Sequence, residues 1–286
     1  MAVLFRKTVI AGVGLLGASI ALAARRAAVV DRIVGYGRAE TSLALARERG
    51  MIDRYFIAPE EFPADADLLI VATPVEAIVP TVRAFLPRLD RRCIVTDVGS
   101  VKGRVVRQME RLVAGRVAFV GAHPIAGSEQ WGPEFGSADL FVDHRCILTP
   151  TKKTDARALE KIACFWRQLG AKVEFMSPAV HDNVLAVVSH LPHVAAYALV
   201  NTLSRAEVDS LDVKAYCAGG FKDITRIASS RPELWRDICV ANREALAANL
   251  GKYIRELNQL RRWIIKRDGK NLEKEFARAN EVRRQI

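Results

Sequence analysis

Hydrophobic and polar positions follow two different periods along this chain. In the first half, short aliphatic and β-branched runs alternate with stretches whose apolar residues recur at helical spacing. The runs predict strands at residues 7–14, 32–38, 67–74, 93–100, 117–124, 144–150 and 172–178. Helices are expected between them at 15–27, 40–50, 75–87 and 154–170. This alternation predicts right-handed crossovers and a mainly parallel, doubly wound α/β sheet with helices on both faces.

Helical periodicity takes over after Ser177. Long helical patterns cover residues 183–204 and 232–268, and a polar tail follows at 271–286. We therefore expect an α/β domain at 1–177 and an all-α domain at 178–286. Helices this long and apolar do not bury their hydrophobic faces alone, so the second domain is expected to pair with a second copy as a homodimer.

The segment GVGLLG, residues 12–17, lies between the first strand and the first helix. In a dinucleotide-binding turn, Gly12 allows the tight bend, Gly14 lets the backbone approach a pyrophosphate, and Gly17 allows helix and strand to pack closely. Leu15 and Leu16 begin the helix, whose free N–H groups attract phosphate. The pattern favours a Rossmann-like nucleotide site, with a glycine-rich turn that binds no ligand as the alternative.

The end of the second strand bears on the choice of cofactor. NAD-binding domains place an acidic residue there for the ribose hydroxyls. This chain has Gly37 followed by Arg38, and a guanidinium suits a 2′-phosphate. The sequence therefore favours NADP over NAD, although Glu40 lies close enough to keep NAD open. Thr73 and Pro74 end the third expected strand and are assigned to the same cofactor site.

The segment GAHPIAGSE, residues 121–129, places His123 before a proline. It reads as too irregular for a helix and too rich in glycine for a strand. A neutral imidazole near pH 7 is a suitable proton acceptor, so His123 is the candidate catalytic base; the alternative is a histidine bonded only to loop backbone. Ser100, in the loop DVGSVKG, is expected either to orient a substrate hydroxyl or to cap a helix.

Composition and charge narrow the partners. The chain has 286 residues and a formal net charge of +11, which favours an anionic ligand. Its basic residues are scattered, which argues against a nucleic-acid-binding arm. The five cysteines form no CxxC pair, so reduced thiols in a cytoplasmic protein are expected rather than disulfides or a metal site. No segment reads as the roughly 20 apolar residues that span a membrane.

Several motifs in register resemble the prephenate/arogenate dehydrogenases of tyrosine biosynthesis. They are GVGLLGASIA, VATPV, DVGSVKG, GAHPIAGSEQWGP, HDNVLAVVSHLPHVAAYALV and GGFKDITRIASSRPELWRDICVANREAL. The resemblance implies NAD(P)-dependent oxidative decarboxylation of prephenate to 4-hydroxyphenylpyruvate, or of arogenate to tyrosine. It also implies that His123 is the catalytic histidine.

For the second domain, the resemblance implies that His193 contacts the substrate and that Arg226 holds a substrate carboxylate. Arg226 has an alternative as half of an ion pair with Asp223 or Glu129. His190, inside an apolar helix that Pro192 is expected to bend, is either a second substrate contact or a satisfied core histidine. The remaining assignments are an ionic gate formed by Glu129 and Asp223, Ser128 at the substrate site, Gly219 and Gly220 either in a loop over the ligand or in a plain turn, and Trp235 and Trp263 in the core or a subunit interface.

Two other functions remain open from the residues alone. A β-hydroxyacid or 6-phosphogluconate-type dehydrogenase would use Lys222 as its catalytic lysine. A regulatory protein that senses NADP(H) would keep the glycines of residues 12–17 but would not need His123, His193 and Arg226 together. The presence of all three favours the dehydrogenase of tyrosine biosynthesis.

Overall fold

The computed structural model describes residues 3–209 and 211–286, which fall into two compact units, one ending at Asn242 and the other spanning Arg243–Ile286. The strands of the first unit are β1 (Phe5–Ala11), β2 (Val30–Tyr36), β3 (Arg54–Phe56), β4 (Leu68–Val71), β5 (Ile94–Asp97), β6 (Ala118–Val120), β7 (Ala122–Pro124), β8 (Arg145–Leu148) and β9 (Lys172–Phe175). Its α-helices are α1 (Leu15–Arg26), α2 (Glu40–Glu48), α3 (Val75–Phe85), α4 (Gly103–Val113), α5 (Ala156–Gln168), α6 (Pro178–Leu185), α7 (Leu191–Ser204), α8 (Gly219–Thr225) and α9 (Pro232–Ala241).

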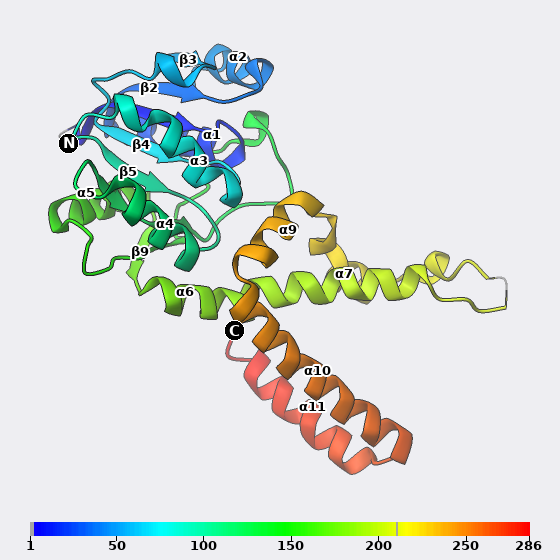
Figure 1. The fold of residues 1–286 in the computed structure, drawn as a ribbon. Coiled ribbons are helices and arrows are strands. Elements are labelled where there is room, and N and C mark those ends of the chain that lie inside the picture. The colour runs from blue at the N-terminus through cyan, green and yellow to red at the C-terminus, as the bar shows by residue number, and fades with distance from the viewer. Residues whose placement is uncertain (1–2, 210) are drawn as a thin grey trace. The chain divides into compact units, whose positions relative to one another are not determined.

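The main sheet has the doubly wound architecture that the sequence predicts. Its six strands run in the order β3-β2-β1-β4-β5-β6, and every neighbouring pair is parallel (Figure 1). The chain begins in the middle at β1, winds outward to β3, and then returns to wind the other way through β4 to β6. The turns after β1, β2, β4, β5 and β6 therefore meet at one edge of the sheet, where ligands bind in this architecture.

Two hydrophobic layers cover the two faces of this sheet. Ile10 and Ile70 pack with α1, α2 and α5 on one face. Their neighbours Val9 and Val71 pack with α3, α4 and α9 on the other. Successive strand residues point to opposite faces, so near-continuous apolar strands are what a sheet buried on both sides requires. The short strand β3 was not expected from the sequence pattern, and helix α4 was expected only through the alternative role of Ser100 as a helix cap.

The expected strand at 117–124 is wrong as a single element. The chain leaves the main sheet after β6, and β7 begins a second sheet of order β7-β8-β9. In that sheet β7 is antiparallel to β8, and β8 is parallel to β9. The break falls at Gly121, where a Cβ atom would lie 2.6 Å from the Thr149 hydroxyl oxygen.

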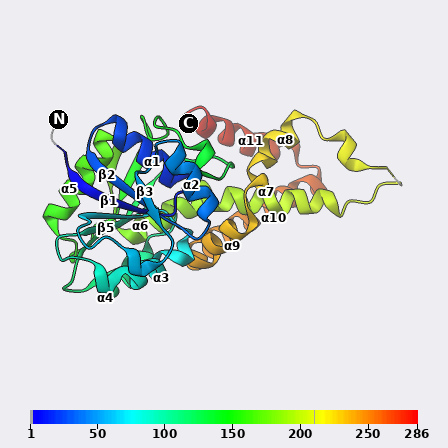
Figure 2. The ribbon, with the colours of Figure 1, turned by 90° about the horizontal axis from the view of Figure 1, so that it is seen from above.

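Helices α6 and α7 form one helical run in Figures 1 and 2, joined by a π-helical stretch at Ala186–His190. Pro192, which was expected to bend the helix, lies in the first turn of α7, where its missing N–H is tolerated, and the π-helical stretch ends two residues before it. Contrary to expectation, the run Pro178–Ser204 is long and apolar enough to cross a membrane, and an 18-residue window within it has a mean hydropathy of 1.4. Core helices of soluble proteins meet the same criteria, and this run carries His181, Asp182 and His190 buried within the first unit.

The second unit is a helical hairpin of α10 (Arg243–Lys266) and α11 (Gly269–Arg283). The helix expected at 232–268 is therefore divided at Asn242 into α9 and α10. Asn242 has a non-helical backbone, and its side chain bonds back to α6 and to the π-helical stretch. Asp268 caps α11 by accepting a hydrogen bond from the Asn271 N–H.

Candidate active site

The turn after β1 has the geometry of a nucleotide-binding turn. Gly12 has φ +95°, and a Cβ atom there would lie 2.6 Å from the Ala72 carbonyl oxygen. A Cβ atom on Gly17 would lie 2.1 Å from the Gly12 carbonyl oxygen, so both positions require glycine. Gly14 is the N-cap of α1. A Cβ atom there would have no neighbour within 4 Å, and no side chain caps the helix. The free space and uncapped N–H groups fit a dinucleotide pyrophosphate.

The other predicted cofactor residues lie at the same edge of the sheet. Gly37 directly follows β2, and a Cβ atom there would make only ordinary contacts with Leu43, so packing does not require glycine. Arg38 is exposed, while the Glu40 carboxylate accepts a hydrogen bond of 3.2 Å from the Tyr55 hydroxyl.

The loop after β4 approaches the glycine turn from the next strand. Pro74 is the N-cap of α3, and the Thr73 hydroxyl oxygen is buried with no hydrogen-bond partner within the described residues. An unpartnered buried hydroxyl beside a nucleotide-binding turn is a candidate ligand contact. Two leucines begin α1. Leu16 packs against the hydrophobic layer that contains Ile10 and Ile70, and Leu15 is half-buried.

His123 lies in strand β7, so the expectation of a wholly irregular segment is wrong. Its backbone pairs with Ile147 of β8, and its side chain is 8% exposed. Its Nδ1 lies 2.8 Å from Nε2 of His181, on α6. The Nδ1 of His181 lies in turn 2.9 Å from Oδ1 of Asp182. A buried line of hydrogen bonds, here named the relay, therefore runs from His123 through His181 to Asp182.

The relay determines which nitrogen of His123 carries the hydrogen. Burial raises the pKa of Asp182, but hydrogen bonds from His181 and from two backbone N–H groups outweigh burial and leave the pKa below its ordinary value. The ionised carboxylate accepts a hydrogen from His181 Nδ1, so His181 Nε2 has the lone pair. His123 Nδ1 must then donate to His181 Nε2, and the lone pair of neutral His123 lies on Nε2.

Burial and a neighbouring cation keep His123 neutral. Desolvation is the main cause that holds the pKa of His123 well below its ordinary value; the Lys102 charge lowers it further, and so would a proton on His181 or His190. Burial also lowers the pKa of His181, although its hydrogen bond to Asp182 opposes that shift. An imidazole in this state is unprotonated at neutral pH and has one free acceptor nitrogen.

Ser100 lies between β5 and α4, close in sequence to a buried ion pair. Helix α4 starts at Gly103 with Lys102 at its N-cap, so Ser100 is not the cap, contrary to one of its two expected roles. Lys102 and Asp97 are both fully buried and form an ion pair with each other. The backbone N–H of Lys102 donates to Asp182 at 2.7 Å, and that of Gly103 donates to the same carboxylate at 2.8 Å.

The two histidines of the 183–204 segment have different surroundings. His190 is 1% exposed; its Nδ1 lies 3.0 Å from the Asn242 amide nitrogen, and its Nε2 is buried without a partner among the described residues. Because the Asn242 amide donates, the hydrogen of neutral His190 lies on Nε2, and burial lowers its pKa to about 4. His193 is only half-buried and stacks on Trp235 with ring centroids 3.5 Å apart. Trp235 is therefore a buried aromatic that orients His193.

Arg226 pairs with Glu129, the second of its two expected partners. Its Nη1 lies 3.1 Å from the Glu129 carboxylate, and both side chains are more than two-fifths exposed. Asp223 forms no ion pair with either residue in the described part of the chain. Ser128 accepts a hydrogen bond from the Gln130 N–H and shapes the local turn. Gly219 and Gly220 are the first residues of helix α8, so their expected place in a loop is wrong.

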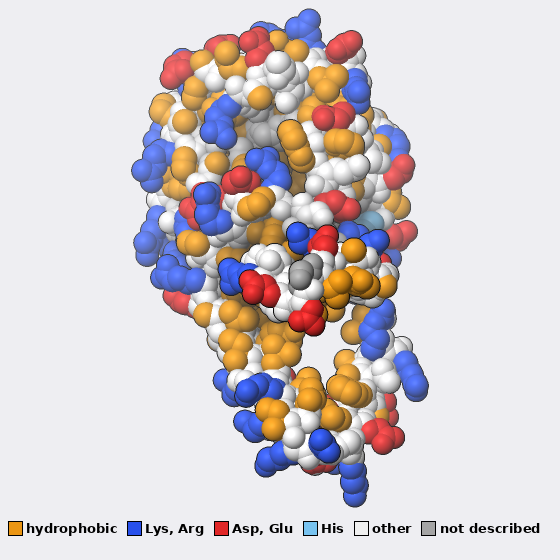
Figure 3. All heavy atoms as spheres, turned by 90° about the vertical axis from the view of Figure 1, so that its right-hand side faces the viewer, with side chains coloured by type: hydrophobic (Ala, Val, Ile, Leu, Met, Phe, Trp, Pro, Cys, Tyr) orange, Lys and Arg blue, Asp and Glu red, His pale blue; other side chains and the backbone are white. Residues whose placement is uncertain are grey.

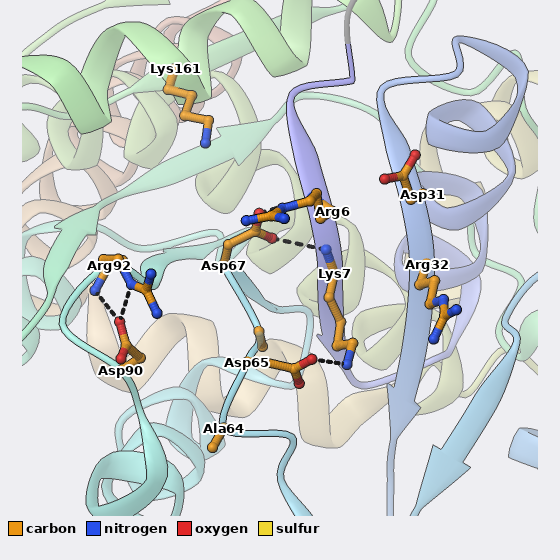
Figure 4. Close-up of a pocket in the computed structure, with 11 residues that line it drawn as sticks. Arg6, Lys7, Asp31, Arg32, Ala64, Asp65, Asp67, Asp90, Arg92 and Lys161 are labelled. Carbon is orange, nitrogen blue, oxygen red and sulfur yellow. Dashed lines mark hydrogen bonds and ion pairs between the residues drawn. The ribbon is translucent and has the colours of Figure 1, made fainter.

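A pocket of about 540 Å³ lies at the opposite edge of the sheet, where β1, β2, β4 and β5 begin. Figure 4 shows that its charged side chains largely satisfy one another: Lys7 pairs with Asp65, and Arg92 with Asp90. None of the predicted site residues lines it. The predicted site residues therefore lie outside this pocket.

Comparison with known proteins agrees with this geometry. The family model described as "Prephenate dehydrogenase, nucleotide-binding domain" matches residues 20–175, and "Prephenate dehydrogenase, dimerization domain" matches residues 177–278. The chain belongs to the prephenate dehydrogenase family. This membership makes the protein an oxidoreductase with a Rossmann-like nucleotide-binding domain, as the sequence predicted.

Relatives of this family match the chain over nearly its whole length. A cyclohexadienyl dehydrogenase of Zymomonas mobilis is 36% identical over 98% of this chain and 95% of its own. A prephenate dehydrogenase of Bacillus subtilis is 36% identical over 96% of this chain and 74% of its own. A crystal structure of Aquifex aeolicus prephenate dehydrogenase with hydroxyphenyl propionate and NAD⁺ is also 36% identical, has a TM-score of 0.94, and matches over 98% of both chains.

The structure brings together residues that the sequence did not single out. Asp97, Lys102, His181, Asp182 and Asn242 surround or support His123, yet none was a predicted prephenate dehydrogenase site residue. The sequence contained some of the features that could have pointed to these residues. Asp97 and Lys102 lie in the quoted loop after a strand, and a His-Asp pair at residues 181–182 opens the first long helix. Their burial, which marks them as functional candidates, becomes visible only in the fold.

Proposed function

We propose that this protein catalyses the oxidative decarboxylation of prephenate to 4-hydroxyphenylpyruvate with a nicotinamide cofactor, arogenate to tyrosine being the other reaction of the same type. The observation that carries this proposal is the relay, which leaves a buried neutral imidazole with its lone pair on Nε2. A base of this kind suits a reaction in which a ring hydroxyl loses its proton as its carbon loses hydride.

His123 Nε2 accepts the hydroxyl proton in this scheme. The positive charge that forms is shared with His181 through the 2.8 Å contact, and the Asp182 carboxylate stabilises it. The bound nicotinamide supplies the hydride acceptor. Loss of the ring carboxylate as carbon dioxide returns its bonding electron pair to the ring, which becomes aromatic. We assign to Ser100, in the loop after β5, the role of orienting the hydroxyl.

The substrate carboxylates need cationic or donor groups, and the helical part supplies them. Arg226 can exchange its exposed Glu129 partner for a substrate carboxylate, since a guanidinium binds either in the same way. The His193 ring stacks on the Trp235 ring, and His190 has a buried N–H without a partner among the described residues. Lys222, which a β-hydroxyacid dehydrogenase would require, is exposed on α8, and this weakens that alternative.

For the cofactor, we propose NADP in preference to NAD. Arg38 is exposed beside Gly37, where packing would tolerate a side chain but none is present. Glu40, the acidic residue that could serve the NAD ribose, is bonded to Tyr55 instead. The Aquifex relative was crystallised with NAD⁺, and an assay with both cofactors tests the preference in this protein.

We further propose a cytoplasmic homodimer formed through the helical domain of residues 178–286. Helices of that domain expose large hydrophobic side chains: Val187, Val188, Leu199, Ile224, Ile254, Ile264, Ile265 and Phe276. Figure 3 shows hydrophobic side chains among lysines and arginines on the helical hairpin at the bottom of the view. Apolar surface of this kind favours association with a second copy, which light scattering of the purified protein would detect.

One experiment tests the activity and the cofactor together. Purified protein is mixed with prephenate or arogenate and with NAD or NADP, and the absorbance of the reduced nicotinamide is followed. We expect turnover with prephenate and a higher kcat/KM for NADP. His123→Asn should lower kcat by about 10²–10⁴-fold while NADP binding is retained. His144→Asn, which changes an exposed histidine outside the relay, is the control. Normal turnover by the His123 variant would overturn the proposed base.

A further inference from the structure

We propose that Asp97 and Lys102 are positioning residues that hold His123 in place for its reaction. The proposal rests on the proposed role of His123 as proton acceptor. It concerns two side chains that do not reach the reacting atoms themselves.

The Asp97 and Lys102 side chains form hydrogen bonds with the backbone of Ala122, the residue directly before His123. Lys102 Nζ donates a hydrogen bond of 2.8 Å to the Ala122 carbonyl oxygen. Asp97 Oδ1 accepts a hydrogen bond of 3.3 Å from the Ala122 N–H. Both polar backbone groups of Ala122 are thus bound by side chains that are themselves paired and fully buried.

These two hydrogen bonds lie where the chain passes from the main sheet to the second sheet. Asp97 ends β5 of the main sheet, and Ala122 begins β7 of the second. Gly121 separates β6 from β7, so the main sheet's ladder does not hold His123. The other Asp97 oxygen accepts a hydrogen bond of 2.9 Å from the Gly99 N–H, next to Ser100. The pair therefore connects the loop of Ser100 to the strand of His123.

Lys102 also holds the far end of the relay. Its backbone N–H donates to Asp182 Oδ1, the oxygen that accepts the His181 hydrogen. One residue thus contacts the strand of His123 with its side chain and the carboxylate of Asp182 with its backbone. A shift of Lys102 would therefore move both His123, through Ala122, and His181, through Asp182, and so change the distance between the two imidazoles.

Stability alone is a weak reason for such a pair. Moving two charges into a protein interior costs more than many pairs return, and neutral residues of similar size are often equally stable there. A cation next to His123 also opposes a second positive charge, which keeps the imidazole neutral before reaction. The titratable groups that face His123 from the elements around it are Lys102, Asp97, His181, Asp182, His190 and Cys146.

The test replaces both charges with neutral groups of similar size, Asp97→Asn together with Lys102→Met. The matched control is Asp65→Asn with Lys7→Met, which removes another lysine–aspartate pair of the same unit at the opposite edge of the sheet. We expect kcat of the first variant to fall by about 10–100-fold, because sub-ångström placement of the base is lost. The KM values for substrate and cofactor should change by no more than about threefold, and the control should match wild type. Lys102→Arg alone should keep more activity than the double variant.

A second measurement needs no turnover. Labelling the five histidines with ¹⁵N and assigning His123 through His123→Asn reports the tautomer and titration of this imidazole by NMR. We expect the Nδ1–H form in wild type, and a mixed population that titrates at higher pH in the double variant. If wild type fails to oxidise either substrate but the NMR change occurs, the proposed function fails and the positioning stands. An unchanged His123 signal with wild-type kcat in a folded double variant would overturn the positioning.

Discussion

The substitution Asp182→Asn removes the negative charge from the relay while it keeps the size and shape of the side chain. Asp182 Oδ1 accepts hydrogen bonds from the Lys102 N–H at 2.7 Å and from His181 Nδ1 at 2.9 Å, and Oδ2 accepts one from the Gly103 N–H at 2.8 Å. In Asp182→Asn, the amide oxygen should stay toward Lys102 and His181, because this orientation keeps two of the three bonds. The tautomers of the relay are then retained, and the negative charge alone is lost.

The size of the kinetic effect follows from that charge. When His123 takes up a proton, the positive charge shared with His181 is stabilised by the carboxylate. A hydrogen bond to a charged group exceeds a neutral one by about 1–2 kcal/mol. Removing the charge should therefore lower kcat about 5- to 30-fold. The acidic limb of the kcat profile should also move to lower pH, because protonated His123 is less stabilised.

Stability and kinetics can be separated by a matched control. In Asp182→Asn, the NH₂ group of the new amide faces the Gly103 N–H, which loses its acceptor and costs about 1–3 kcal/mol of stability. Asp67→Asn imposes the same kind of loss at the opposite edge of the sheet, where the two Asp67 oxygens accept hydrogen bonds from the Arg6 and Lys7 N–H groups (Figure 4). Both variants should unfold at lower temperature, and only Asp182→Asn should lose kcat. Wild-type kcat and pH profile in folded Asp182→Asn would refute the role of the relay in catalysis.

Three further changes probe other parts of the protein. Arg226→Ala should chiefly raise the substrate KM, by about 10-fold or more, since a charged hydrogen bond is lost; an unchanged KM in an unstable variant would make Arg226 structural. Arg38→Ala should raise the KM for NADP more than that for NAD, and equal effects would exclude a contact with the 2′-phosphate. Lowering the pH should destabilise the fold: unfolded His190 binds a proton below about pH 6.5, but the buried side chain does so only near pH 4. This difference removes about 3 kcal/mol between those pH values, and urea titrations of His190→Gln should show a correspondingly flatter pH dependence.

The nucleotide-binding half was predictable because its signals are local. Gly12 and Gly17 are required by backbone contacts within a few residues or with the adjacent strand, and the parallel, doubly wound sheet follows from the alternation of apolar runs with helical stretches. His123 was also singled out as a candidate from its own neighbours in sequence. The relay could not be found in this way, because His123 and His181 are 58 residues apart and meet only after α6 has packed beside α4. A lysine such as Lys102, in a glycine-containing loop, reads as exposed until the fold shows it buried.

The break at Gly121 shows why the wrong strand prediction matters for the chemistry. An unbroken strand from residue 117 to 124 would have kept His123 in the parallel ladder beside β5, with its backbone held by that strand. The break instead transfers His123 to a three-residue strand of a second sheet, which a few ladder bonds hold on one side only. The Asp97 and Lys102 side chains supply the missing hydrogen bonds on the other side. The departure from regular sheet geometry and the buried ion pair are thus two parts of one arrangement, which places an imidazole beside α6 and holds it there.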